Sequence, residues 1–152
     1  MLVLSAVAAG LALVITWASR TTVLITVHGK SMKPTLHSGD HVLVRRGALP
    51  KRGQLVVVEQ PSQKGEAWPY EPAGLGCRHE PLSNRRWLIK RVAAVAGDPV
   101  LPGQLGNRDV TDRCVPEGHF VLLGDNARVS LDSRQIGFFP ESRILGKVWR
   151  TL

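Results

Sequence analysis

The sequence predicts a mostly β domain that follows one apolar helical segment at the amino terminus. Three observations support this prediction. Fifteen glycines and ten prolines interrupt the 152-residue chain so often that long soluble helices are disfavoured. Short runs rich in β-branched and aliphatic residues recur between turn signals. Leu2–Ser19, by contrast, is one uncharged apolar run. We therefore divide the chain into an anchor, residues 1–20, and a β-rich domain, residues 21–152.

The composition sets further bounds. The chain is 43% hydrophobic and 21% charged, which is typical of a packed globular domain. Its net charge of +8 allows an anionic partner, such as nucleic acid or a lipid surface, without requiring one. The only two cysteines, Cys77 and Cys114, exclude a disulfide-dense scaffold and a four-cysteine zinc site, although they could pair with each other in an oxidising compartment.

The apolar run Leu2–Ser19 has the properties of a membrane anchor. As a helix it would be about 27 Å long, close to the ~30 Å hydrocarbon core of a bilayer. Trp17 would lie near one interface and Arg20 would end the span in water. A cleaved secretory signal would usually have a basic segment before the apolar run, and a buried core helix is the third alternative. The charges that flank the run leave its orientation open.

After the anchor, six runs have the β-branched or aliphatic character of strands, and turn-forming residues separate them. They are Thr21–Val27, His41–Val44, Gln54–Glu59, Trp87–Val95, His119–Leu123 and Ile144–Trp149. Residues 61–86 contain four prolines and lack a periodic apolar face, so we interpret this segment as an inserted surface loop.

Several common catalytic motifs are missing from the sequence. It has no HExxH or paired Cys/His cluster, no GxSxG and no glycine-rich phosphate-binding loop. A zinc site, an α/β-hydrolase triad and a phosphate-cradling loop are therefore disfavoured.

Lys90 and Ser31 stand out as candidates for chemistry. Of the six lysines, five lie in turn-like or polar settings or near the end of the last predicted strand, whereas Lys90 lies within Trp87–Val95 and is flanked by apolar residues. If it is buried, its pKa falls and the amine becomes a usable base; on the solvated face of an edge strand it would be inert. Ser31 follows a predicted strand in the turn Gly29–Leu36, where Met32 and Leu36 are expected to fix the turn to apolar surface.

Four ordered segments resemble the conserved boxes of type I signal peptidases. They are GKSMKPTL with SGDHVLV, IKRVAAVAGD, GDNARVSLDSRQIGFFP and LGKV. The resemblance runs from about Gly29 to Val148 and also includes the preceding apolar span. It leaves out residues 61–86 and parts of residues 101–116. It implies a signal-peptidase-like (LexA-like) β catalytic domain behind a membrane anchor.

The resemblance also implies roles for individual residues. Ser31 would be the nucleophile and Lys90 the general base, with Ser130 orienting the lysine amine. Asp132 and Arg134 would form an ion pair near Arg91, and Ser133 would help to line the site. The remaining matched residues, expected to contact substrate, are Gly29, Met32 and Pro34. Gly29 replaces a serine that many bacterial members carry, and that serine's hydroxyl completes the oxyanion hole.

The implied activity is a serine endopeptidase that removes signal peptides from secretory precursor proteins. The resemblance implies neither a metal nor an organic cofactor. A single-pass protein of the plasma membrane is implied, with its catalytic domain on the extracytoplasmic side of the lipid bilayer. The same boxes would fit a protease that matures one dedicated precursor. A LexA-type repressor would need a DNA-binding domain that the first twenty residues cannot supply. A basic nucleic-acid-binding module is disfavoured because aromatic residues make up only 5% of the chain, so no nucleic acid is expected as a partner.

Overall fold

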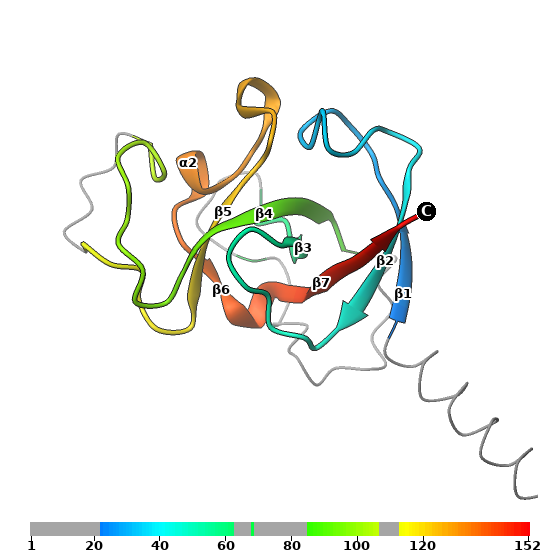
Figure 1. Ribbon diagram of the computed structural model, residues 1–152. Coiled ribbons are helices and arrows are strands. Elements are labelled where there is room, and N and C mark those ends of the chain that lie inside the picture. Colours follow the sequence, from blue (N-terminus) through cyan, green and yellow to red (C-terminus); the bar gives the residue numbers. More distant parts are fainter. Residues whose placement is uncertain (1–21, 63–67, 69–84, 107–112) are drawn as a thin grey trace, which may run out of the picture.

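The computed structural model describes residues 22–62, 68, 85–106 and 113–152. These residues form a seven-stranded antiparallel sheet in the order β1-β2-β7-β3-β4-β5-β6 (Figure 1). The strands are β1 (Thr22–Thr26), β2 (His41–Arg46), β3 (Leu55–Glu59), β4 (Trp87–Val95), β5 (His119–Leu123), β6 (Phe139–Pro140) and β7 (Ile144–Thr151).

The six strands predicted from the sequence are confirmed. Their limits differ by no more than two residues, and the largest differences are at the ends of β2 and β7. β6 was not predicted, because Phe139–Pro140 is too short to show a periodicity. Three short helices were also missed: η2 (Ala127–Val129), α2 (Ser133–Ile136) and η3 (Glu141–Arg143).

The sheet curls so that its two halves enclose the core. β3 lies near the middle of the sheet, and its residues Val56–Glu59 are all buried. β2 alternates between the core and the outside: Val42 and Val44 are buried, while His41 and Arg45 are exposed. Three groups of buried apolar side chains fill the interior, and the group that contains Val42 and Val44 also receives Met32 and Leu36.

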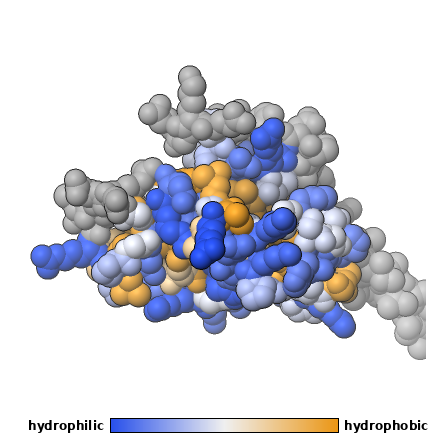
Figure 2. Space-filling model, turned by 90° about the horizontal axis from the view of Figure 1, so that it is seen from above, coloured by the Kyte–Doolittle hydropathy of each residue, from blue (hydrophilic) through white to orange (hydrophobic). Residues whose placement is uncertain are grey.

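Two loops that carry predicted site residues lie at the same end of the molecule. The turn after β1 and the loop after β5 both lie at the top of Figure 1. Viewed from above, the protein has an apolar area surrounded by hydrophilic side chains (Figure 2). The fold thus brings segments about one hundred residues apart in sequence to one end of the sheet.

Several predicted features fall outside the described residues. The anchor, residues 1–20, and most of the predicted insertion at 61–86 are among them. Within the described ranges, no helix has the length and apolar character that crossing a bilayer requires. Cys114 is exposed and forms no disulfide with any described residue, and Cys77 is outside the described residues.

Replacing Gly146 should destabilise the fold. Gly146 lies in β7 between β2 and β3, and an added Cβ would overlap the backbone oxygen of Arg45. Because backbone atoms would have to shift, Gly146→Ala should lower the free energy of unfolding by about 1–3 kcal/mol. Arg150→Ala, at an exposed position of the same strand, is the control and should change stability by no more than about 0.5 kcal/mol. Equal chemical-denaturation curves for the two variants would contradict this packing.

Candidate active site

The turn after β1 holds Ser31 on a buried apolar base. Backbone hydrogen bonds between Val27 and the pair Gly39 and Asp40 close the loop, with N···O distances of 2.8–2.9 Å. Met32 and Leu36 are buried in the core, and Leu36 N donates to Met32 O at 2.9 Å. The prediction that these two side chains fix the turn is therefore confirmed. Ser31 is half-buried beside them.

Lys90 is buried in β4, not exposed on an edge strand. Only 1% of the residue is accessible, and Nζ donates a hydrogen bond to Ser130 Oγ at 3.0 Å. Burial lowers the pKa of Lys90 from its ordinary 10.5 to about 8, because the charged amine loses its hydration. The carboxylates of Asp132 and Asp125 oppose this shift, and Arg134 adds to it. A neutral amine is therefore available close to physiological pH.

Ser130 lies between Lys90 and a buried carboxylate. Asp132 is fully buried; it forms an ion pair with Arg134 at 2.6 Å and accepts a hydrogen bond from Gly124 N at 2.8 Å. Burial alone would raise the pKa of Asp132, but hydrogen bonds from Arg134, the Ser130 side chain and the backbone hold it below its usual value. Because Asp132 stays ionised, it accepts a hydrogen bond from the Ser130 hydroxyl. This contact orients the Ser130 oxygen to accept a hydrogen bond from the Lys90 amine.

Asp132 also organises the short helix that begins at the next residue. It is the N-cap of α2, where its side chain accepts from Arg134 N and Gln135 completes a capping box. Ser133, the first residue of α2, is buried, and its hydroxyl accepts a hydrogen bond from Leu122 N at 2.8 Å. Ser133 thus joins α2 to β5.

The serine turn and the Lys90–Ser130 pair meet at Gly124. A Cβ at this position would overlap Ser130 Oγ and lie 2.9 Å from the Ser31 backbone oxygen. Asn126, two residues after Gly124, also contacts the serine turn, because its backbone N donates to Ser31 O at 2.9 Å. Only glycine permits this approach, which brings Ser31 and the hydrogen-bond partner of Lys90 close to one buried residue.

A second ion pair joins the same three segments. Arg91, which was expected near the Asp132–Arg134 pair, binds Asp125 through Nε at 2.8 Å and Nη2 at 2.6 Å. Thr35, in the serine turn, donates to Asp125 Oδ2, the oxygen that also accepts from Arg91 Nη2. Hydrogen bonding to Arg91 lowers the pKa of Asp125, which keeps the carboxylate charged. Asp125 was not predicted as a site residue, although its place in the Gly124–Asn126 turn was a signal for it.

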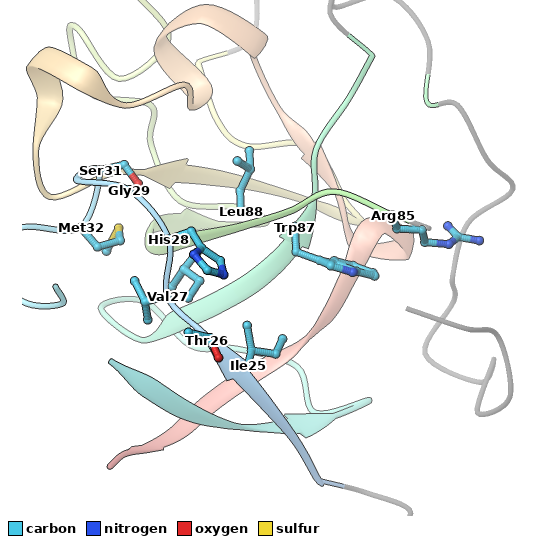
Figure 3. Close-up of a pocket in the computed structure, with 11 residues that line it drawn as sticks. Ile25, Thr26, Val27, His28, Gly29, Ser31, Met32, Arg85, Trp87 and Leu88 are labelled. Atoms are coloured by element: carbon cyan, nitrogen blue, oxygen red, sulfur yellow. The ribbon is translucent and has the colours of Figure 1, made fainter. Parts of the chain in front are cut away.

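A groove of about 260 Å³ begins at Ser31 (Figure 3). One side is formed by Ile25–Gly29 with Met32, and the other by Trp87–Ile89 from β4. Ser31 lies at one end and Arg85 at the other (Figure 3). Of the three residues expected to contact substrate, Gly29 and Met32 line the groove. Pro34 is exposed and is not among the lining residues.

Comparison with known proteins identifies the family. The model of the family described as signal peptidase, peptidase S26, matches residues 1–102 and 101–151. The chain belongs to this family. The sequence resemblance to type I signal peptidases is thereby confirmed, and the family assigns the chain to the peptidases.

Among the described residues, no group of three or more His, Cys, Asp or Glu side chains could hold a metal ion.

Two relatives of the signal peptidase family illustrate the extent of the similarity. Signal peptidase IB of Staphylococcus aureus is 31% identical over 144 residues, which cover 81% of this chain and 73% of that protein. Mitochondrial inner membrane protease subunit 1 of Mus musculus is 30% identical over 130 residues, which cover 83% of this chain and 66% of that protein.

The buried amine predicts a characteristic dependence of stability on pH. Between pH 8 and 10.5 the unfolded chain binds a proton at Lys90 that the folded chain releases, so stability rises with pH in this window. The free energy of unfolding of the wild type, relative to Lys90→Met, should therefore increase by about 3 kcal/mol from pH 8 to 10.5. Lys51→Met controls for the loss of one lysine charge at an exposed site. If the wild type and Lys90→Met differ in free energy of unfolding by the same amount at every pH, the Lys90 amine is not buried as described.

Proposed function

We propose that this protein is a serine endopeptidase in which Ser31 is the nucleophile and Lys90 is the general base. The observation that carries this proposal is the buried Lys90 amine, which has a pKa of about 8 and is held by Ser130 next to the serine turn. An amine in this state can accept a proton from a serine hydroxyl without the help of a histidine. Membership of the signal peptidase family supports the same assignment.

The first half of the reaction forms an acyl-enzyme. Neutral Lys90 accepts the Ser31 hydroxyl proton as Oγ attacks the carbonyl carbon of the scissile peptide bond. The ammonium that forms is stabilised by the negative charges of Asp132 and Asp125, both of which favour protonated Lys90. It then donates its proton to the leaving amine, and the peptide bond breaks.

The second half of the reaction releases the acyl group. Lys90, neutral again, takes a proton from water as that water attacks the Ser31 ester, and the proton finally returns to Ser31 Oγ. The Ser31 backbone N–H is the proposed oxyanion donor in both halves. Gly29 supplies no hydroxyl as a second donor, and such a donor is typically worth roughly 2.7–4 kcal/mol in the transition state.

The groove is suited to an extended peptide. In the described sheet, β1 is an edge strand and pairs only with β2. The pairs between β4 and β5 start at Arg91, so residues Trp87–Lys90 of β4 pair, within the described sheet, with β3 alone. The groove therefore runs between two strand edges whose backbone groups can bind a substrate strand. Its largely apolar lining fits the small residues at positions −3 and −1 that the family resemblance implies.

The proposed substrates are secretory precursor proteins, cleaved at the end of the signal peptide. In this proposal residues 1–20 anchor the protein in a lipid bilayer, and residues 21–152 form the catalytic domain on the extracytoplasmic side. The mechanism uses only side chains of this chain and requires no cofactor. Maturation of one dedicated precursor would use the same chemistry, and the range of precursors that are cleaved distinguishes the two.

The proposal is tested by cleavage of a panel of precursors, with the cut sites mapped. Ser31→Ala and Lys90→Met should each lower kcat by at least about 10³-fold while the protein stays folded. Ser142→Ala and Lys51→Met change an exposed serine and an exposed lysine, and these variants should cleave like the wild type.

The wild-type kcat/KM should fall roughly tenfold per pH unit below pH 8, because only neutral Lys90 is active.

Three results would contradict the proposal. The first is cleavage by Ser31→Ala at the wild-type rate, and the second is a wild-type rate that does not depend on pH across this range. The third is tight, salt-dependent binding of nucleic acid by a wild-type protein that cleaves no precursor, which would favour a basic binding module.

A further inference from the structure

A second cluster of buried charges lies away from the Ser31 and Lys90 site. Glu59, the last residue of β3, is 1% exposed, and its Oε2 accepts from Arg85 Nη1 at 3.0 Å and from Arg143 Nη1 at 3.2 Å. The Arg85 side chain is 6% exposed. Glu59 Oε1 is buried and has no hydrogen-bond partner among the described residues. Two cations and one anion held out of water carry a desolvation cost that a simple apolar contact would avoid.

Arg143 supports this carboxylate from the far side. Its guanidinium carbon lies 5.0 Å from the centre of the Trp68 ring, and Trp68 packs edge-to-face on Phe139 at 6.1 Å. The Glu59 carboxylate is thus fixed against the body of the domain. Arg85, in contrast, belongs to the groove: it forms the end opposite Ser31 (Figure 3).

The groove wall next to Arg85 is the amino-terminal part of β4, Trp87–Lys90. In the described sheet, residues Trp87–Lys90 are paired on one side only, with β3. Their ladder ends at the pair Glu59–Trp87, and beyond it Gln60 N donates a hydrogen bond to Arg86 O at 2.8 Å. Lys90, at the inner end of this stretch, is hydrogen-bonded to Ser130, and the Glu59–Arg85 ion pair lies beside the last strand pair at its outer end. A strand end that pairs on one side opens locally at lower cost than a stretch that pairs on both.

We propose that Glu59 is a positioning residue for substrate binding, which acts by holding Arg85 and thereby the outer half of the groove wall. This inference rests on the proposed function, because it takes the groove as the substrate site. With the Glu59–Arg85 ion pair in place, Trp87–Ile89 is ordered before substrate arrives. Without it, the substrate must order that stretch on binding, which weakens binding but leaves the chemistry at Lys90 unchanged.

The test is a double-mutant cycle of Glu59→Gln and Arg85→Met, assayed with a precursor-derived peptide that spans the mapped cleavage site. Arg85→Met leaves Glu59 paired with Arg143, so it is the variant expected to keep the fold best. Each single variant should raise KM roughly three- to tenfold, the size expected when one or two more side chains must be ordered on binding. The value of kcat and its pH midpoint should not change. The KM of the double variant should be no higher than that of the more affected single variant, because both substitutions remove the Glu59–Arg85 ion pair.

Arg86→Met is the matched control. It removes a positive charge from the neighbouring exposed position and keeps the backbone carbonyl that Gln60 uses, so its KM should stay at the wild-type value. Hydrogen exchange of the free protein gives a readout that needs no catalysis. Amides of Trp87–Ile89 should exchange faster in Glu59→Gln and in Arg85→Met, while those of Val92–Val95, which pair with β5, should not change.

The two readouts separate failure of this inference from failure of the proposed function. Unchanged exchange at Trp87–Ile89 in both variants would overturn the positioning role whatever the activity of the wild type. So would additive effects on KM in the double variant, or a fall in kcat with an unchanged KM. Loss of the whole proposed function would appear as cleavage that survives Ser31→Ala, and it would leave the exchange result standing.

Discussion

Catalysis as proposed depends on one interaction, the burial of the Lys90 amine in hydrogen-bond contact with Ser130. In water a lysine is protonated at every physiological pH and cannot accept a proton. In β4 the surrounding apolar side chains remove its hydration, and the pKa falls to about 8. The nearby carboxylates Asp132 and Asp125 limit this fall, so that the ammonium formed during catalysis is tolerated. Desolvation thus lowers the pKa of Lys90 and makes the neutral base available, while the two carboxylates stabilise its protonated form.

Two features of the loop after β5 keep this balance next to the nucleophile. At Gly124 the absence of a side chain lets Ser130 and the Ser31 carbonyl approach the same point. At Asp125 a bidentate ion pair with Arg91 joins the loop to β4, and Thr35 joins it to the serine turn. Contacts made close in sequence to Ser31, Lys90 and Ser130 therefore fix three segments that are far apart in the chain. The contacts of Gly124 and Asp125 thus hold the serine turn in place beside the Lys90–Ser130 pair.

The strands could be predicted well because β-branched runs between glycine and proline turns carry a clear signal. The state of Lys90 could not be decided in the same way, because WLIKRVAAV fits both a buried strand and an edge strand, and only the family resemblance favoured burial. The partner of Arg91, Asp125, was not predicted, since pairing partners depend on tertiary contacts that sequence spacing does not report. No sequence motif predicted the cluster of Glu59, Arg85 and Arg143. Its members are distant in sequence and meet only where β3, β4 and β7 begin or end.

The most direct measurement of the central claim is the titration of Lys90 itself. The side-chain nitrogen or the adjacent methylene can be followed by NMR as pH is raised, with Lys90→Met used to assign the signal. We predict a single transition with a pKa of about 8, well below those of exposed lysines. A transition near the ordinary value of 10.5 would mean that the amine is charged at neutral pH, and Lys90 could not then be the base.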